Sequence, residues 1–458
     1  MNPEDLARRL LAKDSTLWPE GSEAATRLGW VDIAQRLLPE CDEVMAWARS
    51  IEAERIVLLG MGGSSLGPEV LRSAIGSDRL IVCDTTDPAT VASMPAEGSF
   101  FLVSSKSGTT LEPRALTAHF TELVPDPSRW AAVTDPATRL STEATEAGWA
   151  RVFENDPDIG GRYSVLSWFG LVPAALMGID IAELCRRAAA TDVVEAVSFG
   201  IRMAQAQGEG RDKLTIRVPR GPFHAFGLWV EQLVAESLGK HDTGIVPVPT
   251  IDDEPGDDRE RVSVELSDVA DLGSEMYRWE VATAIAGSVL GIDAFDQPDV
   301  ESAKVATRDA LDNLPLAGDL PDGVETIGPP ALVAWLQDNT DAGDYVAVQA
   351  YVPFGQDEEL ETLRRSVRDS LGGMAVTAGY GPRFLHSTGQ LHKGGPDSCV
   401  AVQVVPSGPT GPVAVPGFGY DFATLIAAQA LGDLEALRAK GRRAVRVAVD
   451  GGRLGAVL

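Results

Sequence analysis

Cysteine is scarce in this sequence, and long apolar runs are absent. The four cysteines of the 458-residue chain lie far apart and form no C-x-x-C pair: Cys41, Cys83, Cys185 and Cys399. Such spacing argues against a zinc site and a disulfide framework, and it fits a reducing cytoplasm. No stretch approaches the roughly 18 apolar residues of a membrane span, and the N-terminal residues MNPEDLARRLLAKD lack the apolar core of a signal peptide. We therefore expect a soluble cytoplasmic protein without a metal site.

Basic residues are also in short supply. The sequence holds 39 lysines and arginines against 67 aspartates and glutamates, which gives a net charge of −28. A surface this acidic repels nucleic acid and anionic membranes, so we expect neither as a partner. It also repels phosphorylated metabolites at long range. Any phosphate site must therefore be built locally from backbone N–H groups, hydroxyls and a few cations.

Strands that end in polar turns divide the chain into α/β units. Continuous apolar runs, typical of buried parallel strands, occur at residues 56–59, 80–83 and 100–103, and each is followed by a polar turn that opens a helix. We predict an α/β fold of two doubly wound domains with parallel sheets, plus a C-terminal α/β region. The predicted boundaries are an N-terminal helical segment at 1–50, a first domain at 51–200, a second domain at 201–325 and the C-terminal region at 326–458.

Four local expectations accompany this division. Residues 33–51 have the pattern of a helix, and residues 311–330 have the composition of a linker or long loop. Strands expected at 345–352 and 400–405 alternate as if one face were exposed. The acid-rich loop at 252–261 has the composition of a solvated surface rather than of a metal site.

Two turns have the composition of anion-binding sites. The first, GMGGSSLGP at 60–68, offers glycines and two serines before a helix, although a tight turn without a ligand explains it equally well. The second, SSKSGTT at 104–110, gathers five hydroxyls and one ammonium group. Helix capping requires only one hydroxyl, so this cluster favours a phosphate monoester.

Single residues elsewhere carry weaker signals. Arg162, in GGRYS, could face a ligand or form a surface ion pair. Gln232 and Glu236 lie four residues apart at the edge of an apolar helix face, where a carboxylate can serve as a base, although solvent exposure is the more common case. His386 lies among small polar residues and could carry a proton near neutral pH or satisfy a backbone group.

Together these motifs resemble the phosphoglucose isomerase family. The resemblance rests on five elements in the family's order: the Gly-rich turn at 60–68, the SKSGTT loop at 105–110, GGRYS at 160–164, the Q-x-x-x-E-S-x-G-K signature at 232–240, and FDQ at 295–297 followed by Lys304. The likeness is strongest to the isomerase half of transaldolase–phosphoglucose isomerase fusions and runs nearly the whole length. No transaldolase half is present in this sequence.

The resemblance implies SIS-type sugar-isomerase folds for both doubly wound domains and a role for each motif. Ser105, Lys106, Ser107 and Thr110 would hold the phosphate, and Gly63, Ser64 and Gln232 would contact the sugar. Glu236 would be the base that moves a proton between C1 and C2, and Arg162 would stabilise the cis-enediol(ate). Lys304 and Gln297 would lie at the ring oxygen or the substrate hydroxyls.

One element departs from the family's chain order. The ring-opening histidine usually follows the glutamate by a few tens of residues, yet no histidine lies between His241 and His386. His386, in an H-S-x-G-Q motif about 150 residues after Glu236, resembles it, with His392 and His241 as alternatives from the same or another subunit. A C-terminal region that covers the active site would explain this placement.

The implied activity is the interconversion of glucose-6-phosphate and fructose-6-phosphate without a metal or organic cofactor. Two alternatives stay open: an isomerase of mannose-6-phosphate or an amino-sugar phosphate, and a non-catalytic sugar-phosphate sensor. The oligomeric state is open as well, with a homodimer among the states that the sequence allows.

Overall fold

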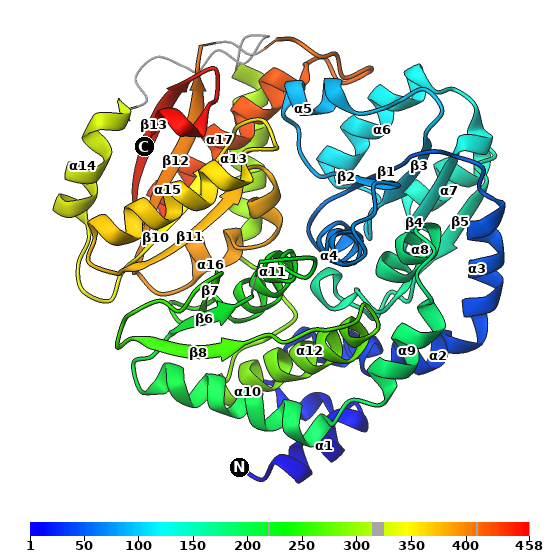
Figure 1. Cartoon of the computed structure of the whole chain (residues 1–458), viewed down its shortest axis with the longest axis horizontal. Helices are drawn as coiled ribbons and strands as arrows, with labels where there is room; N and C mark the ends of the chain where they lie inside the picture. Colours follow the sequence, from blue (N-terminus) through cyan, green and yellow to red (C-terminus); the bar gives the residue numbers. More distant parts are fainter. Residues whose placement is uncertain (219, 314–324, 409–410, 458) are drawn as a thin grey trace.

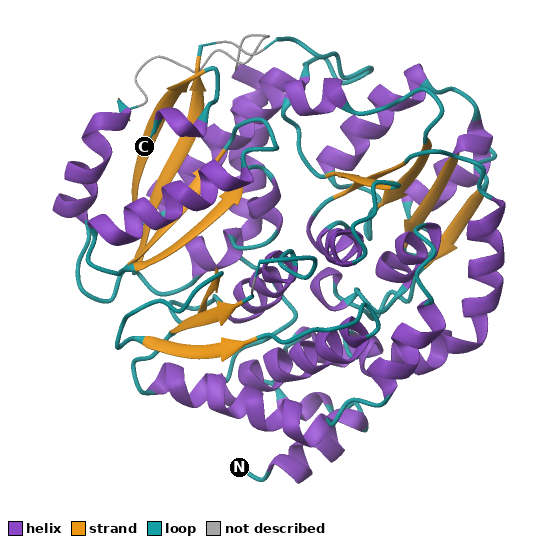
Figure 2. Cartoon of the chain, in the orientation of Figure 1, coloured by secondary structure: helices purple, strands orange, loops and turns teal. Residues whose placement is uncertain are grey.

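The described part of the chain contains three parallel β-sheets (Figures 1 and 2). The computed structural model describes residues 1–458 except 219, 314–324, 409–410 and 458. All strand pairs within the sheets are parallel, which confirms the predicted α/β class with parallel sheets. Figure 1 shows the two five-stranded sheets on opposite sides of the central helix α11 (Phe226–Leu238).

The first sheet has the order β2-β1-β3-β4-β5. Its strands are β1 (Ile56–Gly60), β2 (Leu80–Cys83), β3 (Phe100–Ser104), β4 (Trp130–Thr134) and β5 (Arg151–Glu154). Helices α4 (Leu66–Ala74), α5 (Pro88–Ser93), α6 (Leu111–Leu123), α7 (Arg139–Glu146) and α8 (Trp168–Leu176) belong to the same unit. Every residue of β1, β3 and β4 is buried, as expected for strands covered on both faces.

The strand order brings two distant turns together. β1 lies between β2 and β3, and its last residue pairs in register with that of β3, Gly60 with Ser104. The turns that follow β1 and β3 therefore meet at the carboxyl edge, where open α/β sheets usually bind their ligands.

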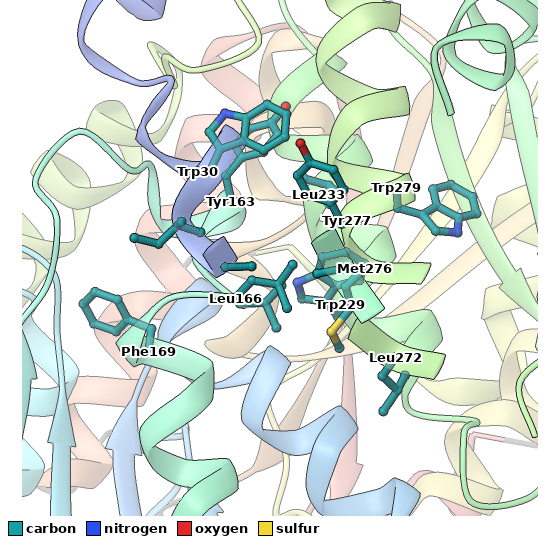
Figure 3. Packing of buried hydrophobic residues seen from close by; sticks show 14 of the residues in the cluster. Trp30, Tyr163, Leu166, Phe169, Trp229, Leu233, Leu272, Met276, Tyr277 and Trp279 are labelled. Atoms are coloured by element: carbon teal, nitrogen blue, oxygen red, sulfur yellow. The ribbon is translucent and has the colours of Figure 1, made fainter. Parts of the chain in front are cut away.

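The small sheet β7-β6-β8, called the central sheet because it comes from the middle of the chain, packs with helices from the same part of the chain. Its strands are β6 (Lys213–Arg217), β7 (Val246–Thr250) and β8 (Arg259–Ser263), and the helices are α9 (Ile181–Ala189), α10 (Val193–Gly208), α11 and α12 (Asp271–Leu290). Trp229 and Leu233 of α11 lie in one apolar cluster with Met276 and Trp279 of α12 (Figure 3). This packing fixes α11, which carries Gln232 and Glu236 on another face.

The N-terminal helices share that core. They are α1 (Pro3–Leu11), α2 (Ile33–Leu37) and α3 (Cys41–Ser50). The indole Nε1 of Trp18 donates to Ala284 O at 3.0 Å, and Tyr277 Oη donates to Val31 O at 2.7 Å. The single helix expected at 33–51 was wrong, because Leu38–Glu40 forms a 3₁₀ turn at Pro39, which has no N–H to continue an α-helix.

The C-terminal sheet has the order β11-β10-β12-β13-β9. Its strands are β9 (Thr326–Ile327), β10 (Tyr345–Ala350), β11 (Ala375–Tyr380), β12 (Cys399–Ser407) and β13 (Arg443–Asp450), and the helices are α13 (Val300–Asn313), α14 (Leu332–Asn339), α15 (Asp357–Ser370), α16 (Gly389–Gly394) and α17 (Phe422–Ala439). The expected loop at 311–330 begins with the end of α13, includes β9 and otherwise falls largely on 314–324, which lie outside the described residues.

The exposed faces expected for β10 and β12 were wrong. All six residues of β10 and the first seven of β12 are buried. The alternation arises from internal polar side chains rather than from solvent, because Gln403 Oε1 accepts hydrogen bonds from Arg446 Nε and Nη2 at 2.8 and 2.6 Å. A polar residue in a strand can therefore be buried when its partner comes from the neighbouring strand.

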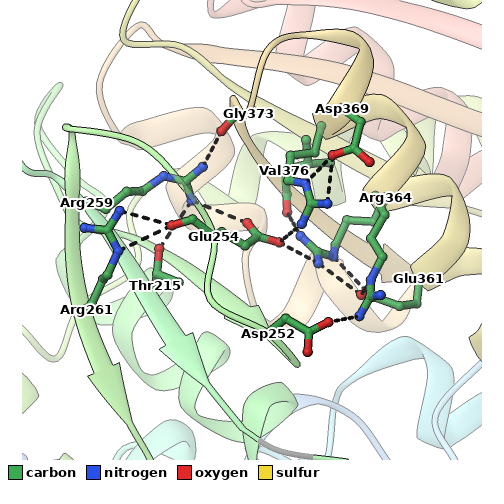
Figure 4. A network of polar contacts seen from close by, with 12 residues as sticks. Thr215, Asp252, Glu254, Arg259, Arg261, Glu361, Arg364, Asp369, Gly373 and Val376 are labelled. Atoms are coloured by element: carbon green, nitrogen blue, oxygen red, sulfur yellow. Dashed lines mark hydrogen bonds and ion pairs between the residues drawn. The ribbon is translucent and has the colours of Figure 1, made fainter.

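The acid-rich loop at 252–261 is largely exposed, as expected, but one of its acids is not. Glu254 is only 2% exposed, and its Oε1 lies 2.8 Å from Arg364 Nη2 and 2.9 Å from Arg368 Nη1 of α15 (Figure 4). The last part of the predicted loop begins strand β8. This loop therefore joins the central sheet to the C-terminal region instead of lying wholly in solvent.

The described residues contain neither a membrane-spanning helix nor a cluster of metal-ligating side chains. None of the helices there is long and apolar enough to span a bilayer. The same residues contain no group of three or more His, Cys, Asp or Glu side chains placed to hold a metal ion. The four cysteines are buried as free thiols.

Candidate active site

A pocket of about 830 Å³ opens at the carboxyl edge of β1 and β3. It is closed by α11, by α13 and by the segment that starts at His386. All the site residues predicted from the sequence line it: Gly63, Ser64, Ser105, Lys106, Ser107, Thr110, Arg162, Gln232, Glu236, Gln297, Lys304 and His386. The structure thus brings together residues from six separate motifs, and their chemical roles stay predictions.

The hydroxyl-rich turn forms one wall. Ser105 Oγ donates to Thr110 Oγ1 at 3.5 Å, and the hydroxyls of Ser107 and Thr109 lie 2.9 Å apart. Gly108 has φ +65°, which glycine adopts readily. The turn leads into the 13-residue helix α6, whose N-terminus favours an anion. Local geometry therefore supports an anion at this wall.

Lys106 is already partnered at the same wall. Its ammonium group forms an ion pair with Asp135 and donates to Pro157 O at 3.0 Å. Burial raises the pKa of Asp135, although the hydrogen bond and charge of Lys106 act against that effect. A phosphate at this wall would share the lysine with Asp135.

Two glycine turns touch each other beside this wall. A Cβ on Gly63 would lie 1.9 Å from Gly161 O, so only glycine fits that position. The contact fixes the turn that carries Arg162 against the turn that carries Ser64. Close packing of the two backbones therefore requires glycine at position 63, whereas a Cβ on Gly161 would meet no atom within 4 Å.

Glu236 lies at the centre of the pocket's polar contacts. Its Oε1 is 2.9 Å from Arg162 Nη1, and its Oε2 accepts a hydrogen bond from Gln232 Nε2 at 2.9 Å. Arg162 is 3% exposed and also donates to Gln297 Oε1 at 2.9 Å. Both carboxylate oxygens are therefore held in fixed positions beside a compensating positive charge.

Two further residues of the 232–240 segment, Ser237 and Lys240, bind residues of neighbouring motifs. Tyr163 Oη donates to Ser237 Oγ at 3.2 Å, and Lys240 Nζ lies 2.7 Å from Asp296 Oδ1. Burial, together with the charge of Arg162, lowers the pKa of Lys240 to about 8. These contacts join three of the motifs. Lys304 differs, because its side chain is 54% exposed and lies 3.4 Å from Glu301.

The three candidate histidines have different environments. His386 lines the pocket, and its Nε2 lies 2.8 Å from Glu112 Oε1. His392 is buried against Tyr345 Oη at 2.9 Å, and burial lowers its pKa to about 3. His241 is exposed in the turn after α11 and is not part of the pocket lining. The geometry favours His386.

Sequence reasoning missed the partners of His386. Glu112 is 4% exposed and accepts a hydrogen bond from Gln429 Nε2 at 2.6 Å, and Gln429 Oε1 accepts one from Thr86 at 2.6 Å. In the sequence, Glu112 reads as an ordinary acid in the first turn of a helix. No local signal connects it to a histidine 274 positions away.

Part of the chain is similar in sequence to known proteins. Residues 42–194 match the family model of phosphoglucose isomerase. A glucose-6-phosphate isomerase of Synechococcus sp. is 33% identical over 214 residues, which are 41% of this chain and 40% of that protein. A glucose-6-phosphate isomerase of Rubrobacter xylanophilus is 26% identical over 363 residues, covering 58% of this chain and 84% of that protein.

This chain is similar to phosphoglucose isomerases over part of its length. The alignment spans less than half of the Synechococcus protein but most of the Rubrobacter protein. The solved structure of a glucose-6-phosphate isomerase from Chlamydia trachomatis has a TM-score of 0.50 and 18% identity, covering 67% of this chain and 79% of that one. At that identity the likeness concerns the fold alone. The predicted likeness to the isomerase half of transaldolase fusions stays a prediction.

Proposed function

We propose that this protein interconverts glucose-6-phosphate and fructose-6-phosphate. The observation that carries the proposal is the position of Glu236, held between Arg162 and Gln232 in a pocket that has a hydroxyl-rich wall and a partly buried His386–Glu112 pair. The relatives named glucose-6-phosphate isomerase support the same conclusion.

The substrate's phosphate would bind at the turn that contains Ser105, Ser107 and Thr110. Binding there supplies energy remote from the reacting carbons and places C1 and C2 of the sugar deeper in the pocket. His386 would donate a proton to the ring oxygen and open the ring. Its pairing with Glu112 suits a group that must carry a proton near neutral pH.

Glu236 would then remove the C2 proton and return it to C1. The cis-enediol(ate) formed between these steps carries negative charge on oxygen, which the guanidinium of Arg162 would stabilise. These steps only move protons between the substrate and the side chains of Glu236 and His386, and the product is an isomer of the substrate. The reaction therefore consumes no oxidant or reductant and needs no metal or organic cofactor.

The remaining predictions on partners and location belong to the same proposal. The net charge of −28 argues against nucleic acid and anionic membranes as partners, and a hexose-phosphate substrate fits a cytoplasmic enzyme. A homodimer is compatible with it.

A coupled assay of fructose-6-phosphate conversion tests the proposal. Glu236→Gln should lower kcat by about 10²–10⁴-fold while sugar-phosphate binding is retained, because general-base catalysis is lost and the pocket keeps its shape. Glu122→Gln makes the same chemical change on the exposed surface of α6 and should leave the rate unchanged.

Other results of this assay would point elsewhere. Activity with mannose-6-phosphate or an amino-sugar phosphate alone would overturn the choice of substrate. Tight sugar-phosphate binding without turnover of any of these substrates would identify a sensor.

A further inference from the structure

A second cavity, of about 970 Å³, shares no lining residue with the candidate active site. It lies between α4 and α5 of the first unit, the N-terminal half of α11, and α15 with β11 of the C-terminal region. Gly227, Leu228 and Glu231 face it from α11, whereas Gln232 and Glu236 of the same helix face the active-site pocket. One helix therefore separates two cavities of similar size.

Glu231 is the exceptional group in this cavity. It is 7% exposed, and its carboxyl group makes no hydrogen bond or ion pair with any residue that the structure describes. Burial raises the pKa of Glu231 to about 8, although the charge of Arg364 acts against that effect. A buried carboxyl group without a partner is costly, and such groups in native proteins usually have a function or a ligand.

Four arginines line the cavity, and none forms an ion pair with Glu231. Arg55 is partly exposed and lies 3.8 Å from Glu54 Oε1, and carboxylates already bind the other three. Arg72 binds both oxygens of Glu69 at 2.8 and 2.7 Å, and Arg383 binds both oxygens of Asp84 at 2.9 and 2.7 Å.

Arg364 likewise binds both oxygens of Glu361, at 2.7 and 3.0 Å. Asp78 and Asp357 line the cavity without an ion pair to any described residue. The charge left unmatched at this cavity is therefore negative.

The rest of the lining limits the kind of cation. Leu80, Leu228, Leu360 and Phe354 supply apolar surface that an alkyl chain can cover. A metal ion would need several ligands, and no group of three suitable side chains exists among the described residues. An anion would meet Glu231 and guanidinium groups that are already paired.

We propose that this cavity binds a small organic cation, a primary amine on a short alkyl chain, whose ammonium group pairs with Glu231. Such a ligand favours the ionised form of Glu231, which releases its proton on binding and accepts hydrogen bonds from the ammonium group. The methylene groups of the ligand cover the apolar wall. The strongly negative chain also concentrates cations near its surface.

Calorimetric titration of the full chain with 1,4-diaminobutane tests this site. Wild type should bind the diamine, Glu231→Gln should bind it at least tenfold more weakly, and the neutral isostere 1,4-butanediol should bind neither protein. Glu122→Gln is the surface control, and Glu236→Gln is the control on α11. Both should bind the diamine as wild type does.

Thermal melting shows whether Glu231→Gln still folds. Its melting temperature without ligand should equal or exceed that of wild type, because the substitution removes a buried unpaired carboxyl group. No binding of the diamine to wild type, equal binding by wild type and Glu231→Gln, or loss of binding in Glu236→Gln instead would overturn the proposal. The titration does not depend on isomerase activity, so its outcome is separate from that of the proposed reaction.

Discussion

His386 Nε2 lies 2.8 Å from Glu112 Oε1, although 274 positions separate the two residues in the sequence. Glu112 comes from the first turn of α6, and His386 ends a short 3₁₀ turn of the C-terminal region. The pair therefore crosses from one sheet unit to another at the wall of the pocket. In the proposed reaction, activity therefore depends on the relative position of the first unit and the C-terminal region.

Replacing Glu112 by Gln should shift the pH profile. Burial lowers the pKa of His386, but the charge and hydrogen bond of Glu112 outweigh it and raise that pKa. Without the charge, the pKa of His386 falls. Because His386 donates a proton to open the ring in the proposed reaction, the high-pH decline of kcat/KM should move to lower pH, with about tenfold or greater loss at neutral pH. An unmoved decline in the variant would contradict the role given to His386.

The same pair should stabilise the fold within a defined pH range. His386 has a folded pKa above its usual 6.5, so its contribution is complete below pH 6.5 and is lost as the pH rises through the folded value. The charge and hydrogen bond of His386 outweigh burial and hold the pKa of Glu112 below 4.5, so its contribution is lost as the pH falls through that lower value. Urea unfolding of wild type and Glu112→Gln should differ most between pH 4.5 and 6.5.

Gln429 should act by positioning Glu112. Gln429→Leu removes the donor at 2.6 Å and leaves the hydroxyl of Thr86 without its acceptor. We expect a loss of about 1–3 kcal/mol in the free energy of unfolding, and a fall in kcat that exceeds any change in KM. The exposed Gln205→Leu is the control and should change neither. An unchanged kcat in Gln429→Leu would show that Glu112 needs no second donor.

The sequence was a good guide where chemistry is local. Continuous apolar runs followed by glycine or hydroxyl-rich turns identified β1 and β3, and their shared edge then follows from parallel pairing. It was a poor guide where partners are distant. No strand was predicted at Trp130–Thr134 or Arg151–Glu154, where small or charged residues dilute the apolar signal.

The same limit applies to the polar residues. Glu254 and Gln403 look like surface residues in the sequence. Arginines from other segments form an ion pair with Glu254 and hydrogen bonds with Gln403, and these contacts offset the free-energy cost of burying the two side chains. Glu112 was missed for the same reason. By contrast, Gln232 and Glu236 lie one helical turn apart, and their contact could be predicted from spacing alone.

Gly63→Ala should damage both stability and activity. The new Cβ would lie 1.9 Å from Gly161 O, so one of two buried backbones must move, and Arg162 moves with it. We expect a loss of about 1–3 kcal/mol in stability and a larger loss of kcat than of substrate affinity. At Gly161 a Cβ would meet nothing within 4 Å, so Gly161→Ala should keep nearly all of the stability. Equal melting temperatures for the two variants would contradict the close contact.

Glu254→Gln should weaken the junction between the central sheet and the C-terminal region. The substitution removes the carboxylate that Arg364 and Arg368 share and leaves Arg364 buried with only Glu361. Breaking a buried ion pair costs about 3–5 kcal/mol, and the lower end is expected because Glu361 remains. Asp253→Asn in the same loop, whose side chain is 85% exposed, should cost less than about 1 kcal/mol. Denaturant unfolding of the two variants should show this difference, and equal midpoints would mean that Glu254 does not hold the two regions together.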